Sequence, residues 1–204
     1  MKQYPVNEIF YTLQGEGHNA GRPAVFIRLS GCNLECPFCD TDFSLKTMMN
    51  REEIIAKVTA YNCDLIVITG GEPSLYIDKE LIDLLHKHNF EIAVETNGTH
   101  KLPDEIDWIT LSPKTHISEL KNAAIKQRRC DEIKLVWDDF ADMYEIANDY
   151  YIKFNCNIGN YYIQPCDTGD KEKNRQLLEE AIRFCLANPE WRLSVQLHKI
   201  LKIK

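Results

Sequence analysis

Three cysteines, Cys32, Cys36 and Cys39, lie within eight residues of the chain, with the spacing C-x3-C-x2-C. They follow an apolar run, residues 24–29, that is typical of a buried strand, so the thiols are expected on a loop at the C-terminal end of that strand. Thiols this close together, in a chain without signs of secretion, indicate a soft metal or an iron–sulfur cluster rather than disulfides. Closed structural sites usually have four protein ligands, so three thiolates leave one metal position open for a substrate or cofactor.

The cysteine spacing alone favours an iron–sulfur cluster over structural zinc, because zinc sites usually show two cysteine pairs. Zinc is the alternative at this point. The other cysteines are scattered and contain no second C-x-x-C, so we interpret them as small buried apolar side chains. A different interpretation is that one of them supplies a fourth ligand; they are Cys63, Cys130, Cys156, Cys166 and Cys185.

Length and charge limit the classes of function. The 204 residues are expected to form one domain, residues 1–204, with a sizeable core. A net charge of -7 argues against non-specific binding of nucleic acid, but it does not exclude a small anion in a local basic pocket. The N-terminus has no apolar secretory segment, and no later run approaches the roughly 20 apolar residues that span a membrane. We therefore expect a cytoplasmic protein with reduced cysteines and with no nucleic-acid or membrane partner.

Apolar strand patterns alternate with amphipathic helix patterns along the chain, which predicts parallel β-α-β units. Strands are expected at residues 7–12, 24–29, 65–69, 91–95, 108–111, 132–136, 161–164 and 193–196. Helices are expected from an N-cap at residue 50 to about residue 61, and at residues 78–88, 140–151 and 171–187, with a short helix within 115–130. Six or seven parallel strands are too few for a closed eight-stranded barrel, which typically has about 250 residues. The fold class is thus α/β, with two candidates: a partial (shortened) TIM-like β/α barrel that stays open, and a doubly wound sheet.

In both candidate folds, functional loops lie at the C-terminal ends of the strands. The cysteine loop falls there, and so do residues 70–73, 96–98, 112–114 and 164–167, so all are expected to meet on one face. Arg28 stands inside an apolar strand, where an arginine is unfavourable unless it is paired. Its guanidinium group is well shaped to hold a carboxylate by two hydrogen bonds. The alternative is that Arg28 faces solvent or pairs with an acid such as Glu16.

The order of these motifs resembles that of the radical S-adenosylmethionine enzymes, in which a C-x3-C-x2-C loop after the first strand is followed by Gly-Gly-Glu-Pro, here residues 70–73, after the next. The aromatic Phe38 directly before the third cysteine also fits that superfamily. More closely, the chain resembles the 7-carboxy-7-deazaguanine synthase family of the queuosine and deazapurine pathways. The matching segments span nearly the whole chain: Leu13-Gln14-Gly15-Glu16-Gly17, Phe26-Ile27-Arg28-Leu29, Cys39-Asp40-Thr41, Glu95-Thr96-Asn97-Gly98, Leu111-Ser112-Pro113-Lys114, Gln164-Pro165 and Gln196-Leu197-His198-Lys199.

This resemblance implies a fold, an activity and partners. The family fold is a shortened partial barrel, generally found as a homodimer. Its members are lyases that contract the ring of 6-carboxy-5,6,7,8-tetrahydropterin, a small-molecule pterin, to 7-carboxy-7-deazaguanine with release of ammonia. Their cofactors are a 4Fe-4S cluster, S-adenosylmethionine and Mg²⁺, and the expected electron donor is a flavodoxin or ferredoxin.

The resemblance also assigns roles to residues. Cys32, Cys36 and Cys39 would bind three irons of the cluster, and S-adenosylmethionine would bind the fourth. Thr41 would bind the Mg²⁺ that also contacts the substrate, which suits a hard ion whose other ligands are substrate and water. The residues expected to contact S-adenosylmethionine are Phe38, Cys39, Asp40, Gly70, Gly71, Glu72, Gly98, Ser112, Pro113, Lys114, Gln164, Pro165, Cys166 and Asp167. Those expected to contact the substrate are Leu13, Gln14, Gly15, Glu16, Arg28, Thr96, His198 and Lys204.

Two other functions fit part of the pattern. Another radical enzyme, such as a glycyl-radical activase, would share the cysteine loop and the Gly-Gly-Glu-Pro segment but not residues 13–17 and 196–199 in this form. A zinc-binding adaptor without chemistry would need only the cysteines. The chain also departs from many radical enzymes, which carry a further glycine-rich motif near the fifth strand, because residues 131–137 contain no glycine. The tail, residues 198–204, is either an edge strand protected by lysines or, by the resemblance, a segment folded over the substrate pocket.

Overall fold

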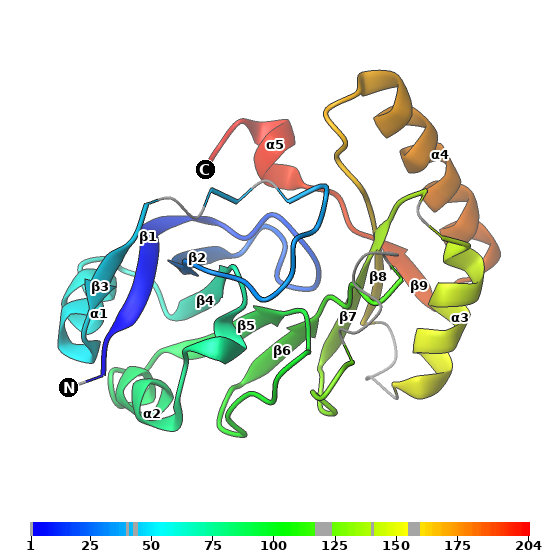
Figure 1. Ribbon diagram of the computed structural model, residues 1–204. Coiled ribbons are helices and arrows are strands. Elements are labelled where there is room, and N and C mark those ends of the chain that lie inside the picture. The colour runs from blue at the N-terminus through cyan, green and yellow to red at the C-terminus, as the bar shows by residue number, and fades with distance from the viewer. Residues whose placement is uncertain (1, 40, 43–44, 117–123, 140, 155–159) are drawn as a thin grey trace.

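The computed structural model describes residues 2–39, 41–42, 45–116, 124–139, 141–154 and 160–204. This part of the chain forms an α/β fold (Figure 1). Its strands are β1 (Tyr4–Leu13), β2 (Pro23–Leu29), β3 (Thr47–Met49), β4 (Leu65–Gly70), β5 (Glu91–Thr96), β6 (Trp108–Leu111), β7 (Glu132–Trp137), β8 (Tyr161–Pro165) and β9 (Trp191–Leu193). Its helices are α1 (Arg51–Val58), α2 (Lys79–Lys87), α3 (Met143–Lys153), α4 (Lys171–Ala187) and α5 (Leu197–Leu201), with one 3-10 turn at Pro73–Leu75. Of the helices described, none is long and apolar enough to cross a membrane.

Within the described ranges, the strands form one nine-stranded sheet in the order β3-β1-β2-β4-β5-β6-β7-β8-β9. β1 pairs antiparallel with β2 and with β3. From β2 across the sheet to β9, in the order β2-β4-β5-β6-β7-β8-β9, neighbouring strands are parallel. A doubly wound sheet reverses its strand order at a switch point, whereas here each new parallel strand is added on the same side. The sheet curves without closing, and α1 to α4 lie around its outside (Figure 1). The partial barrel predicted from the sequence is confirmed.

Local sequence explains where the helices begin. The side chain of Asn50 accepts a hydrogen bond from the Glu53 amide at 2.9 Å, and the Glu53 side chain accepts one from the Asn50 amide at 2.7 Å. This is the expected capping box of α1. Asp78 and Asp170 cap α2 and α4 through side-chain oxygens alone. Each of these caps fixes the residue at which its helix begins.

Two apolar clusters fill the space between the sheet and its outer helices. In one, Ile54 of α1 and Leu81 of α2 pack with Ile27 of β2, and all three side chains are almost completely buried. In the other, Phe184 of α4 packs with Leu135 of β7. Burial of a side chain of this size contributes roughly 1.5–3 kcal/mol. The outer face of the sheet therefore holds the fold together and leaves the inner face available for a site.

The structure corrects three details of the sequence expectation. The last strand is Trp191–Leu193 rather than residues 193–196, because the following segment turns away and the Leu197 amide donates to the Gly15 carbonyl at 3.0 Å. The tail forms α5 instead of an edge strand. β3 lies where the sequence predicted no element. The short helix expected within residues 115–130 falls largely on residues 117–123, outside the described part, and residues 124–130 contain no helix.

Candidate active site

The inner face of the sheet changes character along its strands. Alternate residues of a strand point to opposite faces. Near the strand starts, the inner face is a buried apolar cluster that includes Phe26, Val67 and Ala93. Two residues further along each of these strands, the same face carries Arg28, Thr69 and Glu95, and neighbouring strands add Lys134 and Gln164. The polar ends of the strands are therefore the floor of a site on an apolar base.

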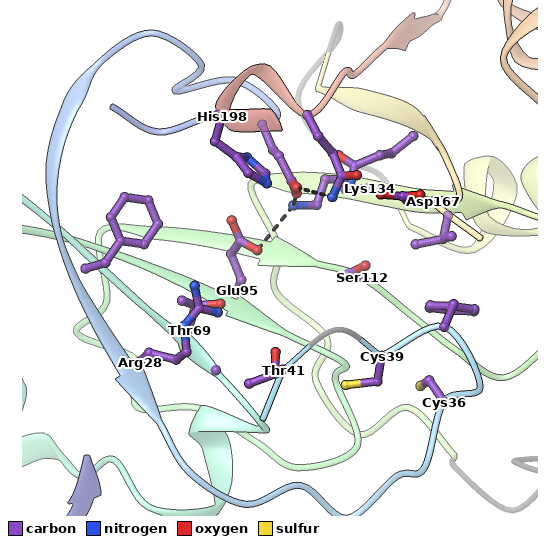
Figure 2. Close-up of a pocket in the computed structure, with 18 of the residues that line it drawn as sticks. Arg28, Cys36, Cys39, Thr41, Thr69, Glu95, Ser112, Lys134, Asp167 and His198 are labelled. Atoms are coloured by element: carbon purple, nitrogen blue, oxygen red, sulfur yellow. Dashed lines mark hydrogen bonds and ion pairs between the residues drawn. The ribbon is translucent and has the colours of Figure 1, made fainter. Parts of the chain in front are cut away.

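These polar side chains line a pocket of about 330 Å³, which is within the size range of small-molecule sites. Figure 2 shows Cys39 and Thr41 on one side of the pocket and His198 on the other, with Glu95 and Lys134 between them. The pocket thus brings together loops from both ends of the chain. Of the residues predicted from the sequence, those that line it are Leu13, Gln14, Gly15, Glu16, Arg28, Cys32, Cys36, Phe38, Cys39, Thr41, Gly70, Gly71, Thr96, Ser112, Lys114, Gln164, Pro165, Cys166, Asp167, His198 and Lys204.

The cysteine loop contributes all three of its thiols to this pocket. The Leu34 amide donates to Cys32 Sγ at 3.4 Å, a contact that stabilises a thiolate. Burial raises the pKa of Cys32 and Cys36, so binding of a metal would have to displace their protons. In the part of the chain that the structure describes, no three His, Cys, Asp or Glu side chains already meet at one point. The donor set of soft thiols on a shared wall fits an iron–sulfur cluster, in which each thiolate binds a different iron.

The two glycines after β4 allow the cysteine loop to sit directly on the end of that strand. Gly70 has φ +121°, a conformation that favours glycine. A Cβ on Gly71 would overlap the carbonyl oxygen of Gly31, and the amide of Glu72 donates to that same oxygen at 3.0 Å. The glycine pair is therefore more than a strand-ending turn, because it fixes the start of the cysteine loop beside exposed backbone of the pocket.

Three predicted contacts of S-adenosylmethionine do not lie on the pocket wall. Glu72 is fully buried behind it, where its carboxylate accepts hydrogen bonds from Thr96 Oγ1 at 2.6 Å and the Asn97 amide at 2.7 Å. This arrangement ties the loop after β4 to the loop after β5. Gly98 packs against the side chain of Leu111, and Pro113 is buried. A fourth predicted contact, Asp40, lies outside the described residues.

A buried charge network crosses the pocket floor. Lys134 Nζ lies 2.5 Å from Glu16 Oε2 and 3.2 Å from Glu95 Oε2, and only 4% of its side chain is exposed. Gln14 Nε2 donates to Glu95 Oε1, and Gln196 Nε2 donates to Glu16 Oε1, both at 3.0 Å. The network links β1, β5, β7 and the C-terminal segment, so it fixes the pocket's shape.

The buried network keeps the side chains of Glu16 and Lys134 ionised. Burial disfavours ionisation of Glu16, but the charge of Lys134 together with hydrogen bonds from Lys134, Gln196 and Gln164 outweighs burial and lowers the pKa of Glu16 to about 2. Burial likewise opposes the charge on Lys134, but Glu16, Glu95 and Glu132 raise the pKa of Lys134 above its usual value. The ammonium and the Glu16 carboxylate therefore stay ionised through the neutral pH range.

The sequence analysis missed Lys134, Glu95 and Gln196 as site residues. The signal for Lys134 was present, because Glu-Ile-Lys-Leu-Val at residues 132–136 places an isolated lysine inside a buried strand. That is the same pattern that singled out Arg28.

A cationic group lies at the β2 side of the pocket. Arg28 Nε donates to Glu8 Oε1 at 2.9 Å, so Arg28 does pair with an acid, but the acid is Glu8 and not Glu16. Lys204 also pairs with Glu8, and the Lys204 ammonium lies 4.8 Å from the centre of the Phe10 ring. One carboxylate, that of Glu8, thus pairs with two cations. Arg28 and Lys204 together can therefore bind a further anionic oxygen.

The C-terminal tail forms the wall opposite the cysteine loop. A Cβ on Gly15 would overlap the imidazole ring of His198, so the tail packs tightly on the β1–β2 turn. On its other side, Lys199 Nζ lies 2.5 Å from Asp167 Oδ2. This hydrogen bond lowers the pKa of Asp167 to about 2. The edge strand is therefore wrong, and His198, Lys199 and Lys204 of the tail line the pocket.

Lys114 lines the pocket from the loop after β6. Its Nζ donates to the carbonyl oxygen of Ser112 at 2.8 Å and to Ser112 Oγ at 2.6 Å. Burial lowers the pKa of Lys114 to about 8. Cys166, which also reaches the pocket, is 5% exposed and packs in the core cluster around α3 and α4, in agreement with the expected packing role.

Comparisons with known proteins agree with this geometry. Residues 26–178 match the model of the Radical SAM superfamily. The chain is 42% identical over 199 residues to the 7-carboxy-7-deazaguanine synthase of Bacteroides thetaiotaomicron, covering 98% of each protein. It is 40% identical to the 7-carboxy-7-deazaguanine synthase of Nitratidesulfovibrio vulgaris, covering 98% of this chain and 99% of that protein. The crystal structure of QueE from Escherichia coli superposes with a TM-score of 0.75 and 29% identity, over 96% of this chain and 95% of that one. The chain therefore belongs to the 7-carboxy-7-deazaguanine synthase family of the radical S-adenosylmethionine superfamily.

Proposed function

We propose that this pocket binds S-adenosylmethionine against the cysteine loop and 6-carboxy-5,6,7,8-tetrahydropterin between that loop and the C-terminal tail. The chain is a radical S-adenosylmethionine lyase of the 7-carboxy-7-deazaguanine synthase family, and its product is 7-carboxy-7-deazaguanine with release of ammonia. One observation carries the assignment of this pocket: three thiols, a paired arginine and a carboxylate–ammonium network all line the same cavity.

The residues around the cysteine loop would hold the cofactors. Cys32, Cys36 and Cys39 would bind the 4Fe-4S cluster, and backbone exposed at Gly70 and Gly71 would lie beside the methionyl end of S-adenosylmethionine. When bound, the reduced cluster and S-adenosylmethionine supply the radical that starts the ring contraction. Further contacts to the cofactor would come from the remaining pocket-lining members of the predicted set, Phe38, Ser112, Lys114, Gln164, Pro165, Cys166 and Asp167.

The residues on the pocket floor would orient the pterin. Its carboxylate fits the cationic group of Arg28 and Lys204, which both pair with Glu8. Leu13, Gln14 and Gly15 would contact the ring from the β1–β2 turn, and Thr96 from the end of β5. His198 and the tail line the pocket on the other side and would help to exclude water from the reacting ring.

The half-buried hydroxyl of Thr41 would bind Mg²⁺ together with the substrate carboxylate. Thr41 lies on the pocket wall, directly after the cysteine loop. Mg²⁺ prefers oxygen ligands and usually keeps several waters, so one hydroxyl, the substrate and water form a reasonable set.

Replacing Thr41 with alanine is expected to raise the Mg²⁺ concentration needed for half-maximal turnover by at least roughly 10–100-fold, the range for loss of an outer partner of a metal ligand, because Thr41 would bind the ion directly. The visible absorbance of the cluster should be unchanged, because the thiols remain. Thr47→Ala, which removes an exposed hydroxyl on β3, is the matched control and should not alter the Mg²⁺ dependence. Loss of the cluster in Thr41→Ala would contradict the metal assignment.

Anaerobic reconstitution tests the proposed function. The protein would be incubated with iron and sulfide and then supplied with reductant, S-adenosylmethionine, Mg²⁺ and the carboxytetrahydropterin, and deazaguanine would be detected by mass spectrometry. We expect a coloured protein that cleaves S-adenosylmethionine and forms 7-carboxy-7-deazaguanine. A colourless protein would indicate a zinc-binding module, and cleavage without deazaguanine would indicate another radical reaction.

A flavodoxin or ferredoxin would deliver the electron to the cluster. The exposure of Cys39 supports this, because it leaves that side of the cysteine loop accessible to another protein. The working form would be a cytoplasmic homodimer of single-domain chains. Size-exclusion chromatography with light scattering measures that state directly.

A further inference from the structure

The turn between β1 and β2 reaches across the inner face of the sheet. Three strands, β4, β5 and β6, lie between β2 and β7 in the sheet, yet the His18 amide of this turn donates to Glu132 Oε2 of β7 at 3.0 Å. The Gly17 amide donates at 3.1 Å to Oγ of Ser194, the residue after β9. The exposed His18 ring stacks on Trp108 of β6, with 4.4 Å between the ring centres. The tip of the turn is therefore held by the far wall of the barrel.

Glu132 supplies the acceptor at the centre of this contact. It is the first residue of β7, is 2% exposed, and points to the same face of the sheet as Lys134, two residues further along. Gly17 has φ +64°, and a Cβ on Gly17 would overlap the Glu132 carboxylate. The turn thus lies directly on the carboxylate, with no room for a side chain between them. Glu132 does not line the pocket, so it is placed behind the site and not within it.

The same turn carries groups that are proposed to contact the pterin. Leu13, Gln14 and Gly15 line the pocket, and the tip of the turn begins two residues later. The turn is closed by two backbone hydrogen bonds, from the Gln14 amide to the Arg22 carbonyl at 2.8 Å and from the Gly21 amide to the Gln14 carbonyl at 2.7 Å. A movement of the tip is therefore transmitted to the pocket wall, where contacts have to be held to within about 0.5 Å.

The acceptor function of Glu132 does not depend on a full negative charge. The charged and titratable groups that face it are Lys134 on its own strand, Glu95 on β5 and His18 on the turn. Burial raises the pKa of Glu132 to about 7, although the charge of Lys134 opposes this rise. Near pH 7 the carboxyl group is therefore partly protonated, and in either form it keeps an oxygen that accepts from the His18 amide. A neutral amide of the same shape should serve as well.

We propose that Glu132 is a positioning residue for the pterin, because it holds the β1–β2 turn in its binding conformation by accepting the His18 amide across the barrel. Without this acceptor the turn would populate other conformations, and the apparent affinity for the pterin would fall with the fraction of molecules in which the turn is in place. The reaction of a pterin already bound would change little, because no group that contacts it is removed. The inference rests on the proposed function, which places the pterin against this turn.

Ligand binding and hydrogen exchange of the anaerobically reconstituted enzyme test the proposal. Glu132→Ala is expected to weaken binding of 6-carboxypterin, followed by its fluorescence, and to raise the KM for the carboxytetrahydropterin, each by about tenfold, as for loss of one hydrogen bond. The kcat at saturating substrate should change by less than about threefold. Amide exchange in residues 14–18, measured by mass spectrometry without ligand, should become faster. Glu132→Gln should restore wild-type affinity and exchange.

Asp131→Ala is the matched control. The Asp131 carboxylate accepts the Ile109 amide of β6 at 2.9 Å, so this variant loses a comparable hydrogen bond from the neighbouring residue without touching the turn. It should keep wild-type pterin affinity and wild-type exchange in residues 14–18. Gly17→Ala keeps Glu132 but pushes the turn off it, because the new Cβ would overlap the carboxylate. It should reproduce the effect of Glu132→Ala, and it takes the place of that variant if Glu132→Ala does not fold.

The outcomes separate this proposal from the function on which it rests. Wild-type pterin affinity, or wild-type exchange of the turn, in Glu132→Ala would overturn the role of Glu132. A Glu132→Gln protein as impaired as Glu132→Ala would also overturn it, because the hydrogen bond would then not be what matters. A wild-type protein that makes no deazaguanine from the pterin would instead contradict the proposed function, and the exchange measurement would still show whether Glu132 anchors the turn.

Discussion

Replacing Cys36 with alanine is expected to abolish the iron–sulfur cluster and, with it, all cleavage of S-adenosylmethionine. Cys36 is one of three thiols on the same pocket wall, and each would hold a different iron, so the two that remain leave a second iron without a protein ligand. The loss of activity should exceed the roughly 10–100-fold that mutation of an outer partner of a metal ligand causes. Visible absorbance and iron content after anaerobic reconstitution measure the effect.

Cys63→Ser is the matched control for this experiment. The Cys63 thiol is half-buried and donates to the carbonyl oxygens of Pro23 and Leu65 at the other end of the strands. This variant should bind iron and sulfide as wild type does. A Cys36→Ala protein that keeps the wild-type iron content would show that the cluster is not held by this loop.

Replacing Lys134 with methionine is expected to lower the free energy of unfolding by about 3–5 kcal/mol, the range for removing one partner of a buried ion pair. Methionine fills a similar volume, but Glu16 and Glu95 would then face one another without a cation. Chemical denaturation followed by circular dichroism measures the change. Lys153→Met, which breaks an exposed pair with Asp149, is the control and should cost less than about 1 kcal/mol.

The pH dependence of stability gives the Lys134 prediction a second, independent readout. In wild type the pKa of Glu16 is about 2, below its usual 4.5, so its contribution is present above about pH 4.5 and is lost as the pH falls toward 2. In Lys134→Met the burial of Glu16 is no longer offset by the ammonium and raises the pKa of Glu16 above its usual value, so stability is lost as the pH rises toward and through neutrality. The deficit of the variant relative to wild type should therefore grow between about pH 5 and pH 8.

Glu132 adds to the same effect. Burial raises the pKa of Glu132 to about 7, so wild type also loses some stability as the pH rises through neutrality, and the charge of Lys134 opposes this rise in pKa. Removal of Lys134 should raise the pKa of Glu132 further, so the difference between the two proteins as a function of pH is the quantity to compare. A difference that stays constant with pH would contradict the charge-network account.

The fold was largely predictable because its signals are local. The capping pair at Asn50 and Glu53 marked the start of α1, and the continuous apolar run at residues 65–69 marked β4. The tail was harder, because residues 197–201 form a helix of five residues with no side-chain cap. Its position depends on contacts with Gly15 and Asp167, residues that are remote in the sequence.

Pocket residues that belong to a recognisable sequence motif could be predicted. Pocket residues that meet only because their strands are neighbours in the sheet could not. The cysteines and the glycine pair were found from spacing. Glu95 and Lys134 were not, because their meeting depends on strand order and on which face each strand turns inward. Glu72 shows the opposite case, since it belongs to a motif but lies buried behind the pocket wall. Alternation of polar residues on the inner face is the general signal that would have found Lys134.

The most direct test of this account is a crystal structure of the anaerobically reconstituted protein with S-adenosylmethionine and 6-carboxypterin bound. The account predicts S-adenosylmethionine between the cysteine loop and Ser112. It predicts the pterin between that loop and the C-terminal tail, with its carboxylate at Arg28 and Lys204. A pterin bound outside this pocket, or S-adenosylmethionine bound away from the cysteine loop, would contradict it.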